Sequence, residues 1–212
     1  MTQPLARQAR ERIVEMILSG DLSAGDTLSE DKLGKLLDMS RTPVREAMKH
    51  LEAEGLAARD GRFLKVRHIG ADEVREIFFL RDTLESYGAR QAVRLSPAVL
   101  GAMRARVEAV MAAGPGEEQW RVDDDFHRMI ASASGNPLLV STVEALRLRT
   151  CIFDHGRIPE RFLKGCHEHL AILAALSAGQ AEEAASRMSY HILQARDAVL
   201  IHLQNRMGLP KS

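Results

Sequence analysis

Four side chains in the C-terminal half of the chain have the types and spacing of metal ligands. Asp123 and His127 are four residues apart, so they lie one above the other on one face of a helix, and Ile130 continues that face inward. His169 and His191 each share a helical face with apolar residues. Three imidazoles and one carboxylate suit a borderline divalent ion such as Zn²⁺, Ni²⁺ or Mn²⁺. If their helices converge, these groups form a metal site inside a helical bundle.

Other interpretations of these residues stay open on spacing alone. A histidine on an apolar face is more often a hydrogen-bonded core residue than a ligand, and Asp123 is one of three consecutive aspartates that can simply be solvated. His167 is a rival to His169 and points to a different face. Cys166, one helical turn before His169, is a softer rival.

A basic stripe in the N-terminal third has the pattern of a DNA-reading helix. Arg41, Arg45 and Lys49 recur every four residues, so they share one face of a helix. Ser40 is placed to cap that helix and Pro43 fits its first turn. Such a stripe at a helix N-terminus suits insertion into the major groove, although a charged stripe can also be a solvated face.

The segments before this helix predict two more helices. Residues 9–18 carry apolar side chains at helical spacing, and Gly20 is placed to end that helix. Residues 28–37 predict a shorter helix with Ser29 as its N-cap. Because only residues 38–40 separate it from the basic helix, the pair forms a helix-turn-helix.

The segment after the basic helix predicts a β-hairpin. Two short runs, 56–59 and 63–66, flank Asp60-Gly61-Arg62, and Asp-Gly between such runs is a strong hairpin signal. Arg62 at its tip is placed to touch phosphates or the adjacent minor groove. Three helices and a hairpin make a winged helix-turn-helix, for which we expect residues 1–67.

Residues 68–72 are expected to link this domain to an all-α domain over residues 73–212. Six helices in this second part predict a helical bundle. They are expected over residues 71–95, from 97 to the break at 114–116, 117–134, from 137 through 152, 160–178 and 181–206, with a loop around Gly156 and Pro159.

Composition agrees with a mainly α protein of two modest domains. The 212 residues are 45% hydrophobic and only 4% aromatic, which favours helices packed through aliphatic side chains. No apolar run approaches the roughly 20 residues needed to cross a bilayer, and no signal peptide is visible, so we expect a cytoplasmic protein. Residues 1–67 hold 12 Lys or Arg and 11 Asp or Glu, so DNA binding must come from local clusters of charge.

The N-terminal motifs resemble the GntR family of bacterial transcription regulators. The resemblance lies in Leu-Ser-Glu at 28–30, Ser-Arg-Thr-Pro-Val-Arg-Glu-Ala at 40–47 and Leu-Glu-Ala-Glu-Gly-Leu at 51–56. Many relatives carry Arg near the start of the short helix, where this chain has Asp31 and then Lys32. The DNA-contacting set that follows from the resemblance and from the basic stripe and wing is Ser40, Arg41, Thr42, Arg45, Lys49, Gly61 and Arg62.

The C-terminal motifs resemble the FCD effector domain of the FadR-type branch of that family. They are Asp-Asp-Asp-Phe-His at 123–127, Gly-Asn-Pro at 135–137, Glu-His at 168–169 and Ser-Tyr-His at 189–191. The resemblance implies a metal held by Asp123, His127, His169 and His191. It also implies an arginine on the first bundle helix that contacts an effector, which would be Arg81. Arg147 and Arg149 are further candidates, and Asn136 either contacts the effector or caps the following helix.

These patterns predict a DNA-binding transcription regulator, most simply a repressor, and not an enzyme. A homodimer would bind a palindromic double-stranded operator, and a small carboxylate metabolite at the metal would change DNA affinity. One alternative is a regulator for which the ion itself is the effector. A second is a metallohydrolase, although four protein ligands crowd a catalytic zinc.

Overall fold

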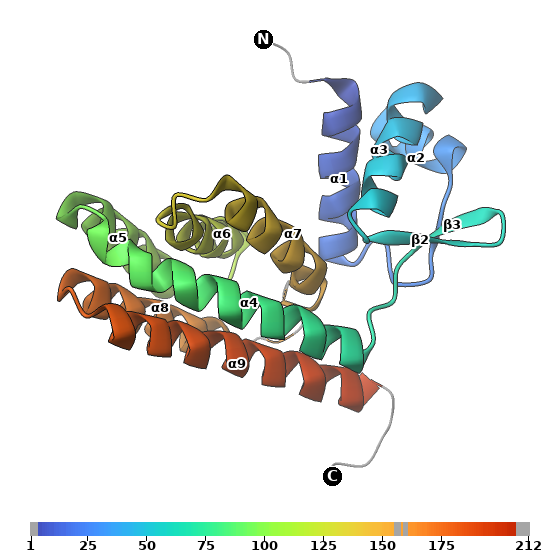
Figure 1. The fold of residues 1–212 in the computed structure, drawn as a ribbon. Helices are drawn as coiled ribbons and strands as arrows, with labels where there is room; N and C mark the ends of the chain where they lie inside the picture. The colour runs from blue at the N-terminus through green and yellow to red at the C-terminus, as the bar shows by residue number, and fades with distance from the viewer. Residues whose placement is uncertain (1–3, 155–157, 159–160, 207–212) are drawn as a thin grey trace. The chain divides into compact units, whose positions relative to one another are not determined.

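The computed structural model describes residues 4–154, 158 and 161–206, and helices predominate in this part of the chain (Figure 1). The chain divides into two compact units, Met1–Ile69 and Gly70–Ser212. The division lies within the segment 68–72 that the sequence marks as a linker. None of the described helices is both long enough and apolar enough to cross a membrane.

The N-terminal unit contains the helices α1 (Leu5–Ser19), α2 (Glu30–Leu37) and α3 (Arg41–Ala53). The α1 helix ends at Gly20, whose φ of 91° is left-handed, as predicted. Ser29 caps α2 by accepting from the backbone N–H of Lys32, also as predicted. Ser40 stands at the N-cap of α3, but its side chain makes no capping hydrogen bond, so that prediction was wrong. Ser40 is exposed, and water can satisfy the first N–H groups of α3.

A small antiparallel sheet completes this unit. Its strands are β1 (Thr27–Leu28), β2 (Ala57–Asp60) and β3 (Phe63–Val66), in the order β1-β3-β2. Asp60 pairs with Phe63 across the predicted hairpin, and Gly61 at its tip has a left-handed φ of 60°. The β1 strand was not predicted because two residues carry no periodic signal. Three helices and this sheet confirm the winged helix-turn-helix.

The C-terminal unit is the predicted all-α bundle. Its elements are α4 (Ala71–Gln91), the 3-10 turn η1 (Ala92–Arg94), α5 (Pro97–Ala113), α6 (Glu117–Ser132), α7 (Pro137–Asp154), α8 (Arg161–Ser177) and α9 (Ala181–Arg206). Six α-helices in the described part of this unit confirm the predicted number. The first was expected to reach Leu95 but ends at Gln91, where the 3-10 turn follows. The expected loop around Gly156 and Pro159 lies outside the described residues.

Within the bundle, α4 and α9 lie side by side, and α8 packs against α9 (Figure 1). Most buried side chains of the interior are aliphatic. Phe78, Phe126 and Met188 are among the largest that are fully buried. Seven polar or charged residues are buried there as well: Arg81, Glu85, His127, Arg147, Thr150, His169 and His191. Because buried polar groups are costly unless they are paired, their partners define the candidate site.

Candidate metal centre and nucleic-acid interface

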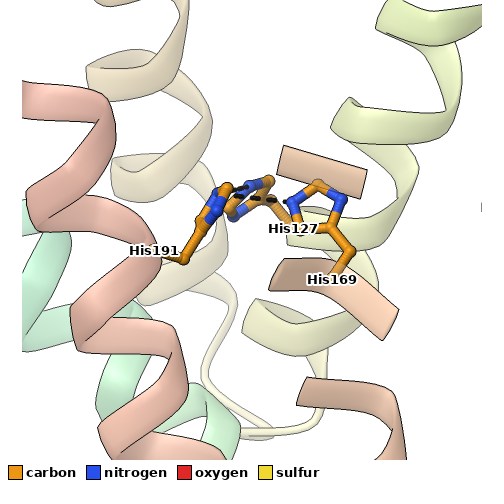
Figure 2. A group of neighbouring side chains, drawn as sticks. All are labelled: His127, His169 and His191. Atoms are coloured by element: carbon orange, nitrogen blue, oxygen red, sulfur yellow. Dashed lines mark hydrogen bonds between the residues drawn. The ribbon is translucent and has the colours of Figure 1, made fainter. Parts of the chain in front are cut away.

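Three helices bring three imidazoles together in the bundle interior. His127 lies on α6, His169 on α8 and His191 on α9, and Figure 2 shows their rings gathered at one point. Nε2 of His191 lies 3.3 Å from Nε2 of His127 and 3.3 Å from Nε2 of His169. One ring nitrogen from each residue lies within 4.8 Å of the other two, and all three residues are buried.

The spacing of these nitrogens fits a shared metal ion. With a metal–nitrogen distance of about 2.1 Å, two ligand nitrogens are about 3.0 Å apart at a right angle and about 3.4 Å apart at a tetrahedral angle. The two separations of 3.3 Å fall between these values. The spacing of these two pairs is therefore that of nitrogens sharing one ion, and the third pair lies within 4.8 Å.

Asp123 places a carboxylate beside the imidazoles. Its Oδ1 lies 3.6 Å from Nε2 of His169 and 4.0 Å from Nε2 of His127. Its Oδ2 accepts a hydrogen bond of 2.6 Å from Arg147. Burial would raise the pKa of Asp123, but the charge of Arg147 and the nearby imidazoles hold that pKa well below its usual value. One oxygen of a charged carboxylate is thus available to a metal while the other is held in place.

Two further carboxylates orient the imidazoles from behind. Nδ1 of His127 is hydrogen-bonded to Glu85, and Nδ1–H of His191 donates to Glu168 over 2.7 Å. A carboxylate on Nδ1 selects the tautomer whose Nε2 lone pair is free for a metal. His169 is positioned differently, since its ring stacks on Phe126 with centroids 4.0 Å apart.

Each of these orienting carboxylates is paired with an arginine. Arg81 donates to Glu85 over 2.8 Å and to the hydroxyl of Thr150 over 3.2 Å, and its side chain is only 3% exposed. Arg161 donates to both oxygens of Glu168, over 2.8 and 2.6 Å. The site is therefore a buried network. The arginines position the two carboxylates, and the carboxylates position the imidazoles of His127 and His191.

Spacing in the sequence did not reveal the parts played by Glu85, Glu168 and Arg161. Two signals were present. Glu85 follows Arg81 by one helical turn, and Glu168 is adjacent to His169 in the Glu-His motif. Neither signal says which imidazole a carboxylate reaches, because both partners lie on other helices.

The protonation states suit metal binding at neutral pH. Burial lowers the pKa of His127 to about 4 and lowers the pKa of His169 well below its usual value. Burial would raise the pKa of Glu85, but Arg81 and His127 hold it well below the usual range. For Glu168, hydrogen bonds from Arg161 and His191 outweigh burial and lower its pKa to about 2. Neutral imidazoles and charged carboxylates are the forms that bind divalent metals.

A cavity of about 70 Å³ opens beside this cluster. Asp123 and the three imidazoles line one part of it, together with Arg81, Arg147 and Arg161, and apolar side chains such as Val107 and Phe162 line the rest. Cys166 also borders the cavity, but burial raises the pKa of its thiol to about 11. The rival ligand His167 is exposed and its Nδ1 lies 2.8 Å from the carbonyl of Leu163, away from the imidazole cluster.

Two residues considered for effector binding lie outside the lining of this cavity. Asn136 caps α7, because its side-chain oxygen accepts from the backbone N–H groups of Leu138 and Leu139. Arg149 lies on α7 and likewise does not border the cavity. Arg147, two residues earlier, reaches the cavity and binds both Asp123 and Asp124.

In the N-terminal unit, α3 presents the predicted basic stripe to solvent. The side chains of Arg41, Arg45 and Lys49 are 70%, 54% and 61% exposed. Ser40 and Thr42 at the start of the helix are exposed as well. At the wing tip, Arg62 lies over the ring of Phe63, 4.9 Å from its centroid, beside Gly61. Exposed cations at the N-terminus of such a helix are placed to meet base edges and phosphates.

Comparison with known proteins agrees with both halves of this architecture. Residues 5–62 match the model of the bacterial regulatory proteins of the gntR family, and residues 76–194 match the FCD domain. The chain therefore belongs to the GntR family of transcription regulators with a C-terminal FCD domain.

Individual relatives support this assignment along nearly the whole chain. The chain is 27% identical over 212 residues to the HTH-type transcriptional repressor RspR of Escherichia coli K12, covering 93% of this chain and 90% of that protein. The solved structure of E. coli McbR/YncC is 25% identical with a TM-score of 0.78, covering 95% of this chain and 98% of the other. The metal-free FCD domain of TM0439 shares the fold, with 20% identity and a TM-score of 0.58 over 65% of this chain and 99% of its own. A repressor is thus among the relatives.

Proposed function

We propose that this protein is a repressor that reads operator DNA through α3, and that a small carboxylate bound at a metal centre in its C-terminal unit changes its DNA affinity. The observation that carries this proposal is the convergence of three buried Nε2 atoms at the wall of a cavity, with Oδ1 of Asp123 beside two of them. Buried polar groups are costly in a core, so four metal-binding groups at one cavity wall favour a ligand-binding role.

The proposed ligands are Asp123, His127, His169 and His191, and the ion would be Zn²⁺, Ni²⁺ or Mn²⁺. When bound, such an ion supplies a Lewis acid with positions left open for a carboxylate if it is octahedral. The chain's own contribution is rigidity, because Glu85 and Glu168 hold two of the imidazoles.

The charges around the cavity favour an anionic effector. Three arginines at its wall are paired with three carboxylates, which balances the charge inside the network, and Arg147 also binds Asp124, which is 56% exposed. A divalent ion would add two positive charges in a buried place, and an organic acid would offset them. The paired residues are Arg81 with Glu85, Arg147 with Asp123, and Arg161 with Glu168.

The size of the cavity favours a small effector. A volume of about 70 Å³ corresponds to about two water molecules at the roughly 30 Å³ that each occupies in the liquid. A short-chain carboxylate fits this volume. In this proposal Arg147 and Arg161 shape the effector site, and Arg81 acts mainly by holding Glu85.

Metal titration tests the centre directly. Chelator-treated protein should gain melting temperature on addition of Zn²⁺, Ni²⁺ or Mn²⁺, and short-chain carboxylates should add a further gain only in the metal-loaded protein. His169→Ala should abolish the metal-dependent gain. His167→Ala is the matched control, since it lies on the same helix but outside the cluster. Equal responses of the two variants would contradict the proposed ligand set.

Operator binding tests the reading helix. Duplexes selected from a random library by the full-length protein should bind the Arg45→Ala variant about 5- to 150-fold more weakly, if Arg45 contacts a base. Arg7→Ala is the matched control, because Arg7 is also an exposed, ion-paired arginine of the same unit but lies on α1. An unchanged affinity of Arg45→Ala would reject the base contact by Arg45.

The remaining parts of the proposal have their own measurements. Sedimentation should find a homodimer, and the selected operator should be palindromic because a two-fold dimer presents two reading heads.

If the ion itself is the effector, a chelator should change DNA affinity when no carboxylate is present. If it only anchors the carboxylate, the chelator should act only when the carboxylate is there.

A further inference from the structure

Two cations of the reading helix, Arg41 and Arg45, are already paired with carboxylates of the preceding helix. Arg45 donates two hydrogen bonds to Glu30, of 2.8 and 2.7 Å, and Arg41 forms an ion pair with Asp31. Glu30 and Asp31 are the first two residues of α2, and Arg41 is the first residue of α3. The surface proposed to meet DNA therefore carries its own anions.

The two pairs differ in how firmly they are held. The Glu30 pair is bidentate and its carboxylate is 31% exposed, whereas Asp31 and Arg41 are 56% and 70% exposed. The hydrogen bond from Arg45 lowers the pKa of Glu30, which is a mark of close pairing. Exposed single pairs contribute little stability, so the Arg41–Asp31 pair is easily exchanged for another partner.

Because the N-terminal unit is nearly neutral, the Arg41–Asp31 pair can have a measurable effect on DNA affinity. Residues 1–67 carry 12 basic and 11 acidic side chains, so no strong overall field draws the unit to DNA. Attraction to phosphates then depends on single cations. Asp31 contacts Arg41 directly, so it lies well within the Debye length of about 8 Å from any phosphate that Arg41 would touch.

We propose that Asp31 is a specificity-determining residue that suppresses binding to random DNA by competing with phosphates for Arg41. This inference rests on the proposed reading role of α3. On random DNA, a phosphate contact by Arg41 replaces its pair with Asp31, so the contact contributes little affinity. At a matching sequence, Arg41 keeps its Nε contact with Asp31 while its terminal N–H groups donate to a base edge, so the pair is not lost there.

The test compares random-sequence and selected duplexes. Asp31→Asn should bind a short random-sequence duplex roughly threefold more tightly at low salt, as expected when one paired cation becomes free to contact a phosphate. The slope of log affinity against log salt should steepen by about 0.9, because Arg41 is freed to neutralise one further phosphate. Affinity for the duplex selected by the wild-type protein should change less, so the specificity ratio falls.

Two controls separate this role from a general effect of charge. Asp21→Asn makes the same charge change at an exposed position after α1, where Asp21 accepts from Ser19, and it should leave the specificity ratio unchanged. The gain of Asp31→Asn should disappear when Arg41 is already replaced by Ala, since the double-mutant cycle isolates the coupling between these residues. Thermal unfolding of each variant checks that the fold is intact.

Several outcomes would overturn the inference. They are equal gains on both duplexes, an Asp21→Asn variant that behaves as Asp31→Asn does, a gain that persists in the Arg41→Ala background, or a loss of binding to both duplexes with the fold intact. The proposed function has a separate readout. If Arg45→Ala loses affinity for the selected duplex while one of these outcomes is seen, only the role of Asp31 fails.

Discussion

In the proposed metal centre, the imidazoles of His127 and His191 are positioned through the ring atoms that face away from the shared point. His127 and His191 offer Nε2 to the shared point because Nδ1 of each is held by a carboxylate. His169 reaches the same point without such a partner and relies on its stack with Phe126. The orienting carboxylates should therefore matter for metal affinity although they do not bind the metal.

Replacing Glu168 with Gln should lower metal affinity about 10- to 100-fold, because Gln cannot orient His191 by a charge-assisted hydrogen bond. Competition with a metallochromic chelator measures this loss. Glu144→Gln is the matched control, since Glu144 lies on α7, is 42% exposed and forms an ion pair with Arg128 of α6. A Glu168 variant that binds metal as tightly as the control would show that the contact is only structural.

The metal-free bundle should lose stability as the pH falls from about 6.5 to about 4. In the folded chain burial lowers the pKa of His127 to about 4, and on unfolding it returns to its ordinary value of about 6.5. The unfolded chain therefore binds more protons in this window, and protonation favours it. His127 alone should lower the free energy of unfolding by roughly 2 kcal/mol between pH 7 and pH 5.

Fluorescence of Trp120, the single tryptophan, follows this unfolding in denaturant, because Trp120 lies in the C-terminal unit. His127→Gln should reduce the pH dependence, whereas His167→Gln should preserve it. Stability that is flat between pH 7 and pH 5 in the metal-free protein would contradict the burial of neutral imidazoles.

Helix packing sets how closely the ligands approach. Gly88 on α4 is buried where this helix meets α6, and a Cβ there would lie 3.0 Å from the backbone oxygen of Ile130 and 3.4 Å from Cα of Ala131. Ile130 follows His127 by three residues on α6. The absence of a side chain at Gly88 thus lets α6 bring His127 close to its partners.

Gly88→Val should push α6 away from α4, at a cost of about 1 to 3 kcal/mol in stability, and should weaken metal binding as well. Gly101→Ala on α5 is the control, because no atom lies within 4 Å of the added Cβ there. That change should stabilise the helix by about 0.5 to 1 kcal/mol and leave metal affinity unchanged. Denaturant titration and metal competition on both variants decide whether the α4–α6 approach positions the site.

In the proposed function the two units carry separate tasks, and regulation requires that effector binding and DNA binding be coupled. An effector changes DNA affinity only if it binds the DNA-competent and incompetent states unequally. Metal-loaded wild-type protein should therefore change its affinity for the selected operator when a binding carboxylate is added. His191→Ala should abolish that change while retaining operator binding in its absence, as measured by fluorescence anisotropy. A carboxylate response that survives in His191→Ala would place the effector elsewhere.

Much of the architecture is local and could be predicted. Apolar residues at helical spacing, the cap at Ser29 and the Asp-Gly hairpin turn act within a few residues of the chain. The family resemblance confirmed by the comparisons rests on motifs of this kind. Local reasoning failed in three places. The hydroxyl of Ser40 makes no cap, the first bundle helix ends at Gln91 before Leu95, and the two-residue strand β1, which was not predicted, exists only by pairing with β3.

Periodicity and motifs were thus enough to establish the helices, the hairpin and the face of α6, α8 and α9 that carries each candidate ligand, because these properties repeat over a few residues. The folded bundle was needed to show that Nε2 atoms from residues 127, 169 and 191 meet, that Glu85 and Glu168 stand behind two of them, and that Arg81 is held by Glu85. Such contacts join residues distant in the chain, and they depend on how helices cross. No pattern along one helix encodes that crossing, so distances between helices emerge only from packing.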